Sequence, residues 1–295
     1  MAALLFFIVD VFAEKKYAGN QLGVFLQAEG LSDAQMQQLA KEMNYSETTF
    51  ILSQEPRSGG YDVRIFTPDK EVPFAGHPTL GTAYIIQQEI IGQPIDKVVL
   101  NLKVGQIPVT FSYGESGPEN LMMKQKEPTF GSQIAAEAIA PILDLQKNEL
   151  DERFPIEDVS TGLPFVIVPL KTLDSLKRIR VDTDKYLKLV EDLEAKAILA
   201  FCQQTHHEQN DLCVRVFANY YGVPEDPATG SANGCLAGYL VKHRYWGKSR
   251  IDIRVEQGYE IGRPSLLFLK AEDNHGKIDV FVGGTVIKIA RGEFV

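Results

Sequence analysis

The most regular pattern along this chain of 295 residues is a series of short runs rich in Val, Ile, Leu and Phe, separated by polar turns. Runs of this length and composition are typical of β-strands. The predicted strands cover 4–12, 21–26, 48–53, 62–67, 97–102, 106–112, 157–160, 164–169, 197–203, 212–218, 250–256, 265–270, 277–282 and 285–290. We therefore expect an α+β protein in which strands dominate.

Fewer segments show helical spacing of apolar residues. Amphipathic helices are predicted at 32–43, with Ser32 as N-cap, and near 133–144 and 184–194. Two further helices, 77–88 and 231–241, contain no Asp, Glu, Lys or Arg and many small residues. A helix that is apolar on every side must be buried on every side. We therefore predict strands wrapped around a central helix, twice in the chain.

An internal repeat explains why this pattern occurs twice. Residues 71–77 read E-V-P-F-A-G-H and residues 225–231 read E-D-P-A-T-G-S, and upstream V-R-I-F at 63–66 recurs as V-R-V-F at 214–217. A repeat of about 150 residues is long enough for each copy to form its own core. It predicts a duplicated domain whose equivalent loops face each other across a cleft.

The domain boundaries follow from the repeat and from a stretch rich in Gly and Pro near 114–130, where we place the crossing between the halves. The predicted domains are an N-terminal lobe, 1–122, and a C-terminal lobe, 123–284. The last strand is expected to cross back, so that residues 285–295 complete the first lobe.

Charge and cysteine content exclude several classes of protein. The net charge is −9 with a pI near 5.2, and no basic run exceeds Lys15 and Lys16, so nucleic acid is not an expected partner. Three cysteines without a C-x-x-C pair indicate a reducing compartment and no zinc cluster. The apolar start lacks a basic segment and ends at Asp10, which favours a buried strand over a leader or a membrane segment. We expect a cytoplasmic protein.

Five motifs stand in one order along the chain: V-D-x-F…G-N at 9–20, N-x-S-E-T at 44–48, F-T-P…E-V-P-x-x-G-H at 66–77, E-D-P-A-T-G-S-A at 225–232 and G-G-T-V at 283–286. With these motifs the chain resembles the PhzF-like (phenazine biosynthesis) isomerase family, which has the diaminopimelate epimerase-like fold. The resemblance implies two pseudo-symmetric domains, each a curved, antiparallel or mixed sheet around a central apolar helix, with the active site between them. It also implies a homodimer that works without metal or organic cofactor.

The reaction that the resemblance implies moves a proton between carbons of a small anionic, carboxylate-bearing substrate. Its acid and base is the carboxylate of N-x-S-E-T, which is Glu47 here. The substrate-binding residues that match the family are Gly76, His77, Asp226, Gly230 and Ser231. Two of these pairs begin the charge-free helices, where free N–H groups and the helix dipole favour a carboxylate.

Glu47 suits a proton shuttle because its two oxygens stand on a short arm, and apolar neighbours such as Phe50 disfavour its charged form. A plainer interpretation is a strand-end glutamate that bonds to nearby backbone. Aligning Phe50 with Phe201 places Ile198 opposite Glu47, so only one half would carry the acid. Likewise, Gly76 and Gly230 could merely allow sharp turns, with Ser231 as N-cap. Arg64 and Arg215, which occur in both copies, are predicted to form structural ion pairs.

Three alternatives bear on the function. Ala75 and Thr229 occupy the positions of the two cysteines of the family's epimerase branch, which disfavours two-base racemisation. A serine hydrolase built from Ser231, His77 and Asp226 lacks the G-x-S-x-G elbow. A non-catalytic protein that binds small anions on the same fold stays open, since fold does not fix function. The sequence does not identify the natural substrate.

Overall fold

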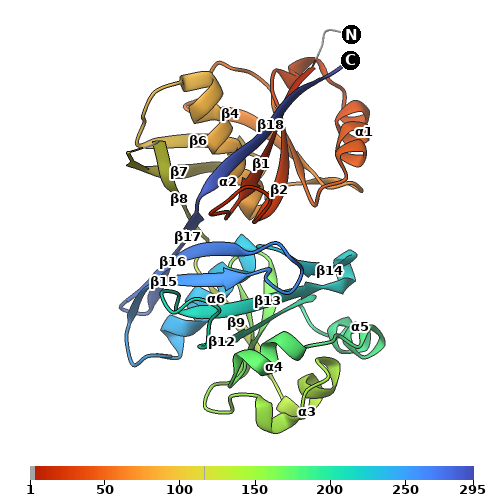
Figure 1. The fold of residues 1–295 in the computed structure, drawn as a ribbon, viewed down its shortest axis with the longest axis vertical. Coiled ribbons are helices and arrows are strands. Elements are labelled where there is room, and N and C mark those ends of the chain that lie inside the picture. The colour runs from red at the N-terminus through yellow and green to blue at the C-terminus, as the bar shows by residue number, and fades with distance from the viewer. Residues whose placement is uncertain (1–3, 116) are drawn as a thin grey trace. The chain divides into compact units, whose positions relative to one another are not determined.

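The computed structural model describes residues 4–115 and 117–295, and the chain divides into two compact units. Unit 1 comprises Met1–Lys124 and Gly283–Val295, and unit 2 comprises Gln125–Val282. Both units contain many strands and a central helix (Figure 1). No helix among the described residues is long and apolar enough to span a membrane.

The sheet of unit 1 runs in the order β18, β1, β2, β3, β4, β6, β7, β8. Neighbouring strands are antiparallel except for the parallel pairs β2–β3 and β4–β6, and the short β5 pairs with β4. The final strand lies beside the first, as Figure 1 shows. The strands are β1 (Leu4–Val11), β2 (Asn20–Phe25), β3 (Thr48–Ile51), β4 (Tyr61–Phe66), β5 (Glu71–Val72), β6 (Lys97–Leu102), β7 (Gly105–Gly114), β8 (Gly117–Lys124) and β18 (Val286–Phe294).

Helix α2 (Gly76–Ile85) is the central helix of unit 1. Its residues from His77 to Ala83, and Ile85, are buried, and it contacts strands at both ends of the sheet, from β18 and β1 to β7 and β8. A wider helical turn, Ile86–Ile91, continues it. The structure therefore confirms that the first charge-free segment is a helix enclosed by strands.

The outer face of this sheet carries α1 (Asp33–Met43) over a small core in which Phe50 stacks on Phe25 at 5.1 Å and meets Phe66 edge to face. Ser32 caps α1 as predicted, and it exchanges hydrogen bonds with Gln35 in a capping box.

Unit 2 repeats the same plan. Its sheet order is β9, β10, β11, β12, β13, β15, β16, the pairs β11–β12 and β13–β15 are parallel, and β14 pairs with β13. Each parallel pair has its counterpart in unit 1, so the duplication holds strand by strand. The strands are β9 (Thr129–Ile134), β10 (Ile156–Ser160), β11 (Pro164–Pro169), β12 (Ala197–Cys202), β13 (Leu212–Ala218), β14 (Val223–Asp226), β15 (Arg250–Gln257), β16 (Ser265–Asn274) and β17 (Lys277–Gly284).

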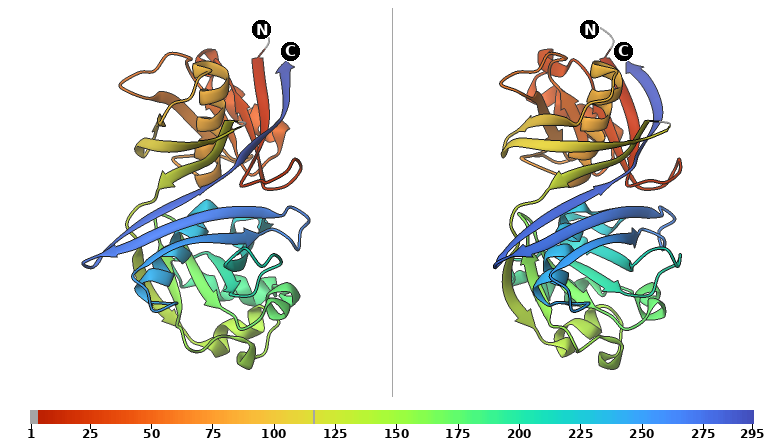
Figure 2. Two further views of the ribbon diagram at one scale, coloured as in Figure 1. Left: turned by 60° about the vertical axis from the view of Figure 1, so that its left-hand side comes forward. Right: turned by 90° about the vertical axis from the view of Figure 1, so that its left-hand side faces the viewer.

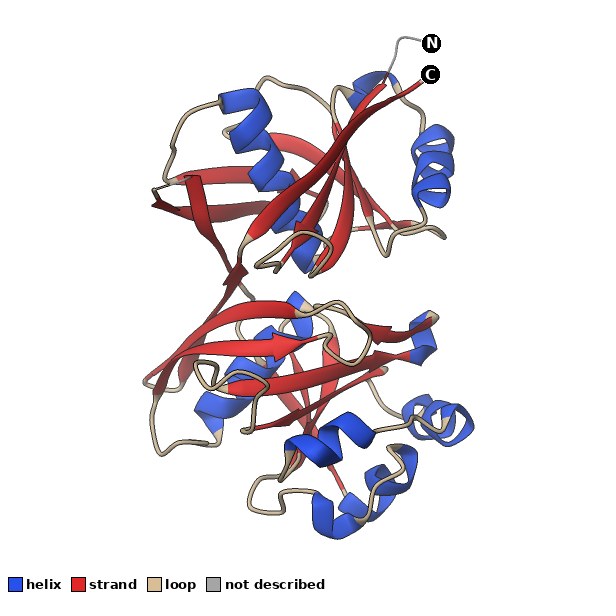
Figure 3. Ribbon diagram, viewed as in Figure 1, coloured by secondary structure: helices blue, strands red, loops and turns tan. Residues whose placement is uncertain are grey.

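Helix α6 (Gly230–Lys242) is the central helix of unit 2, with residues from Ala232 to Val241 buried against β10, β11, β15 and β16. Figures 2 and 3 show both central helices among strands of their own unit. The outer layer is larger than in unit 1. It comprises α3 (Ala136–Ile139), α4 (Leu173–Arg178), α5 (Thr183–Glu191) and the single turns Ala140–Ile142 and Lys147–Glu149, which share a core around Tyr186.

The same ion pair occurs in both copies. Arg64 donates to both carboxylate oxygens of Glu71, and Arg215 donates to both oxygens of Glu225. Each guanidinium also lies over the ring two residues further on, at 5.1 Å in unit 1 and 4.9 Å in unit 2. The prediction that these arginines are structural is confirmed.

Some elements differ from the sequence-based expectation. The helix predicted at 133–144 is wrong in extent, because β9 occupies its first residues and only α3 and one tight turn containing Pro141 follow. The predicted crossing at 114–130 contains a strand, β8, because Gly114 and Gly117 pair across a hairpin. The helix α4 and the short strands β5 and β14 were not predicted.

Candidate active site

Glu47 lies directly before β3, and its side chain is about one-fifth exposed. One of its carboxylate oxygens, Oε2, lies 3.6 Å from Nε2 of His77, which is the second residue of α2. The two residues are far apart in sequence and meet because β3 packs against the central helix. Unit 1 therefore brings together the predicted acid and base and one predicted substrate-binding residue.

His77 is 6% exposed, and burial lowers its pKa to about 3, partly offset by the carbonyl of Gln21. At neutral pH the imidazole is therefore uncharged, although the Glu47 carboxyl group lies close to it. Nε2 lies 3.3 Å from the Gln21 carbonyl oxygen, which only accepts hydrogen bonds, so Nε2 carries the proton. The arrangement is a neutral N–H donor beside a carboxyl group.

The N-terminus of α2 has no side-chain cap. Its N-cap residue is Ala75, and Pro78 has no N–H, so the backbone N–H groups of Gly76 and His77 are the donors at this helix end. Free N–H groups at a helix start favour an anion. The arrangement suits a carboxylate, as the sequence indicated.

In unit 2 the loop at 226–230 is held by a network of side-chain hydrogen bonds. Thr229 donates its hydroxyl to the Asp226 carboxylate, and the amide of Gln257 donates to the Asp226 carbonyl oxygen and to the Thr229 hydroxyl. Asn233 donates to Thr229 O and to Gln257 Oε1, at 3.0 and 2.9 Å. Gly230 is thereby held at the first position of α6.

The alternative in which Ser231 caps its helix is wrong. Thr229 is the N-cap residue and Ser231 is already helical, while the Thr229 hydroxyl is directed to Asp226 and caps no helix N–H. Gly76 and Gly230 are both first residues of helices, so neither needs the left-handed backbone that favours glycine.

The strand register changes one detail of the repeat. In unit 1 Phe50 pairs with Arg64, but in unit 2 Ala200 pairs with Arg215. The counterpart of Glu47 is therefore Ala197, one residue before the predicted Ile198, because the connection from β12 to β13 is one residue longer than the connection from β3 to β4. Alanine does not titrate, so the acid still occurs in one copy only.

Several residues around Glu47 and around the loop at 226–230 were not found from the sequence. Gln257 and Asn233, both fully buried, organise the loop of unit 2, and Gln21 sets the proton on His77. Thr48, beside Glu47, has a buried hydroxyl oxygen without a hydrogen-bond partner. Polar residues inside apolar strands were the available signal, because a buried polar group implies a specific partner.

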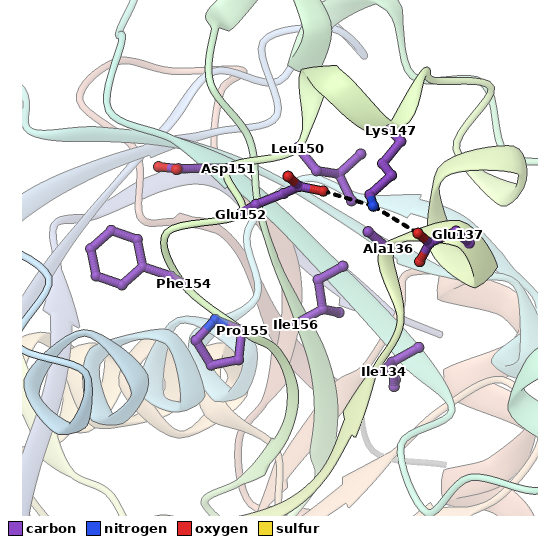
Figure 4. Close-up of a pocket in the computed structure, with 10 residues that line it drawn as sticks. All are labelled: Ile134, Ala136, Glu137, Lys147, Leu150, Asp151, Glu152, Phe154, Pro155 and Ile156. Atoms are coloured by element: carbon purple, nitrogen blue, oxygen red, sulfur yellow. Dashed lines mark ion pairs between the residues drawn. The ribbon is translucent and has the colours of Figure 1, made fainter.

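Two surface pockets lie elsewhere, in unit 2. One of about 450 Å³ is lined by Asp151, Glu152, Arg153 and Lys171, and one of about 260 Å³ lies next to it. In the second, shown in Figure 4, Lys147 bridges Glu137 and Glu152 at 2.7 and 3.2 Å, and all three are more than half exposed. The charged groups of this pocket are paired with one another and exposed to solvent, which is typical of a protein surface and not of a catalytic site. We therefore place the candidate site at the residues described above.

Comparison with known proteins is consistent across sequence and structure. A family model described as phenazine biosynthesis-like protein matches residues 9–292. A trans-2,3-dihydro-3-hydroxyanthranilate isomerase of Pseudomonas fluorescens is 36% identical, covering 98% of each chain, and an uncharacterised isomerase of Clostridium acetobutylicum is 32% identical, covering 97% of this chain and 96% of that one.

Solved structures agree with these matches. The PhzF-family phenazine biosynthesis protein of Bacillus anthracis is 28% identical, covers 100% of both chains and has a TM-score of 0.91. A hydroxyproline epimerase of Agrobacterium vitis, at 10% identity and a TM-score of 0.62, covers 100% of this chain and 91% of its own and shares the fold.

Proposed function

Because the chain belongs to the phenazine biosynthesis-like family of isomerases, we propose that it moves a proton between two carbons of a small carboxylate-bearing substrate. Glu47 is the proposed acid and base. The family membership carries the reaction class, and the position of Glu47 beside neutral His77 carries the assignment of the residue.

The proposed mechanism uses both oxygens of one carboxyl group. Glu47 removes a proton from one carbon, and the same group returns it to another carbon on the same face of the substrate. A single residue suffices, because removing the proton converts the Glu47 carboxylate into the carboxylic acid that returns the proton in the second step. The Glu47 side chain is only about one-fifth exposed, so much of the water around its carboxyl group is excluded.

His77 has a different role in this proposal. Because its imidazole is uncharged at neutral pH, it does not hold Glu47 as a permanent ion-pair partner. Its Nε2–H group can donate to the Glu47 carboxylate or to a substrate oxygen on which negative charge develops. A neutral donor stabilises that negative charge, whereas a charged histidine would form an ion pair with Glu47 and make it a weaker base.

The backbone N–H groups of Gly76 and His77 are the proposed anion-binding donors of unit 1. In unit 2 we assign substrate binding to Asp226, Gly230 and Ser231, the residues that open the uncapped helix α6. The network of Gln257 and Asn233 supports this assignment, because its amide groups hold the loop that leads into α6.

The substrate class follows from the helix ends and from the relatives. Relatives in Pseudomonas are named trans-2,3-dihydro-3-hydroxyanthranilate isomerases, and that compound carries a carboxylate next to an unsaturated ring. We propose a small unsaturated amino or hydroxy acid of this kind for the present chain. We also propose a homodimer that needs no metal or organic cofactor for turnover, as the family resemblance implies.

A non-catalytic anion-binding protein is the second candidate, favoured by the fact that the helix ends alone would bind an anion. It differs in needing no titrating group at residue 47. The serine hydrolase is disfavoured by two contacts. The Asp226 carboxylate accepts from Thr229, and His77 carries its proton on the nitrogen that faces Gln21 and Glu47.

The test is incubation of the protein in deuterated water with a panel of unsaturated and hydroxylated amino and carboxylic acids. Protein-dependent deuterium incorporation at carbon, measured by mass spectrometry and NMR, is the expected result. Glu47→Gln should abolish incorporation while retaining ligand binding, because the amide keeps the shape but does not transfer protons.

Glu42→Gln is the matched control, since Glu42 is an exposed residue of α1 in the same unit. It should exchange as the wild type does. Exchange that persists in Glu47→Gln would remove Glu47 from the mechanism, and ligand binding without exchange in the wild-type protein would favour the anion-binding protein.

A further inference from the structure

A second cluster of chemically versatile side chains lies at one end of strands β13 and β15 in unit 2. Cys213 and Glu256 are partners in neighbouring parallel strands, so their side chains project from the same face of the sheet. Both are fully buried. A ring nitrogen of His206, the Cys213 sulfur and a Glu256 oxygen all lie within 4.8 Å of one another.

The Glu256 carboxylate is held in position by the loop between β12 and β13. It accepts hydrogen bonds from the backbone N–H groups of His206 and His207, at 2.7 and 2.9 Å, and from the amide of Asn210 at 2.7 Å. These three donors are neutral. A carboxylate at zero exposure is costly unless a cation lies nearby, and the donors that orient it leave its charge uncompensated.

The imidazole of His206 is equally well oriented. It stacks on the ring of Tyr259, with centroids 4.1 Å apart and planes at 9°. Its Nε2 atom is buried and has no hydrogen-bond partner, although Oε1 of Glu260 lies 3.3 Å away. The other carboxylate oxygen of Glu260 is also buried without a partner. Two unsatisfied polar atoms therefore lie at one place, beside a buried thiol and a buried carboxylate.

We propose that His206, Cys213 and Glu256 bind a divalent transition-metal ion, with Glu260 as a second carboxylate beside the imidazole. Zn²⁺ fits this donor set best, because it accepts sulfur, imidazole nitrogen and carboxylate oxygen together in tetrahedral sites. The ion satisfies the unpartnered atoms and neutralises the buried carboxylate charge. The proposed isomerase reaction uses none of these residues, so the metal site does not depend on that reaction.

The geometry requires a small closure. Zinc bonds of about 2.3 Å to sulfur and about 2.0 Å to nitrogen or oxygen place tetrahedral donor atoms roughly 3.3 to 3.6 Å apart. The present span of up to 4.8 Å therefore contracts by about 1 Å on binding. Side-chain rotation at His206, which stands on a loop and is 19% exposed, can supply this movement and an entry path.

Binding forms a Zn–S bond and releases the thiol proton of Cys213 to solvent, so the ion remains divalent and no electron is transferred. Because the metal binds the thiolate, metal binding becomes stronger as the pH rises. The bound ion joins four segments, namely the loop at 203–211, β13, the end of β15 and the turn at 258–262. We infer a structural site that stiffens this end of unit 2.

The test is titration of the chelator-treated full-length protein with Co²⁺, which occupies zinc sites and is visible spectroscopically. We expect one Co²⁺ per chain, tetrahedral visible bands and a near-ultraviolet thiolate-to-cobalt charge-transfer band that Zn²⁺ displaces. Zn²⁺ should also raise the melting temperature. Cys213→Ser should lose the charge-transfer band, and His206→Gln should lower the affinity for Co²⁺ by more than about tenfold.

Cys202→Ser is the matched control, because Cys202 pairs with Cys213 from the neighbouring strand β12, is also buried and is not a proposed ligand. It should keep the charge-transfer band. If Cys213→Ser fails to fold, His206→Gln still decides the question, since its side chain belongs to a surface loop. A folded wild-type protein that shows no thiolate band at saturating Co²⁺, or a band that survives in Cys213→Ser, overturns the proposal.

Discussion

The two units share a scaffold but differ at the point where chemistry is proposed. Both have an enclosed helix with an uncapped N-terminus and an arginine–glutamate pair whose arginine stands on β4 or β13. At the start of β3, unit 1 has Glu47 beside His77, whereas at the start of β12 unit 2 has the buried Ala197. Duplication has thus kept the parts that hold the fold and confined the titrating group to one copy.

The largest expected effect tests this asymmetry. Glu47→Gln should lower turnover by about 10²- to 10⁴-fold, the usual contribution of general acid and base catalysis. Adding Ala197→Glu should not restore turnover, because position 197 is fully buried and no histidine is in an equivalent position at the start of α6. Exchange into substrate carbon, measured in deuterated water, is the readout. Recovery of activity in the double variant would show that the two copies are chemically equivalent.

The two arginines sharpen the comparison through stability. Arg215 is 8% exposed and donates to Glu225 and to the carbonyl oxygens of Leu176 and Ile179 as well. Arg215→Met leaves a buried carboxylate and several carbonyl groups unpaired. It should reduce the free energy of unfolding by about 3 to 5 kcal/mol, as for other broken buried ion pairs. Denaturant unfolding measures this, and a loss below about 1 kcal/mol would contradict the structural role.

Much of this fold could be predicted from the sequence, for a physical reason. Strands and buried helices follow from which side chains avoid water, and that pattern is local, so the enclosed helices and the repeated ion pairs were found correctly. The capping box at Ser32 is also local. Elements of mixed composition were not found. Strand β8 begins with Gly, Pro, Glu and Asn before its short apolar run, and only pairing with β7 makes this beginning a strand.

The site was predictable only in part. Family motifs supplied Glu47 and His77, and the structure brings these two together. Gln257 and Gln21 were missed because each acts through a partner more than 20 residues away in sequence, which local patterns do not reveal. The cluster of His206, Cys213 and Glu256 was missed for the same reason. The absence of a C-x-x-C pair argues only against metal sites whose ligands are close in sequence.

The buried histidine of unit 1 predicts a pH effect that unit 2 lacks at the equivalent residue, Ser231. The pKa of His77 is lowered from 6.5 to about 3, so the unfolded chain takes up a proton below pH 6.5 while the folded protein does not. Stability therefore falls as the pH falls through this window, by roughly 1.4 kcal/mol per pH unit for this group. At about pH 5 the loss is about 2 kcal/mol.

His77→Gln removes this contribution, so the difference in unfolding free energy between wild type and variant should change between about pH 8 and about pH 5. Comparing the two proteins cancels the titration of the other groups. Ser231→Ala is the control in unit 2 and should show no pH-dependent difference from the wild type. A difference for His77→Gln that is the same at both pH values would mean that the folded imidazole titrates normally.

The smallest expected effect comes from the arginine of unit 1. Arg64 is 20% exposed, and its partner Glu71 also accepts from Lys103, which remains after substitution. Arg64→Met should therefore cost only about 1 kcal/mol, well below the loss for Arg215→Met. Combining Arg64→Met with Lys103→Met should raise the cost, because Glu71 is only 14% exposed and then has no cation beside it. Equal losses for the two single arginine variants would show that burial does not distinguish the two copies of the pair.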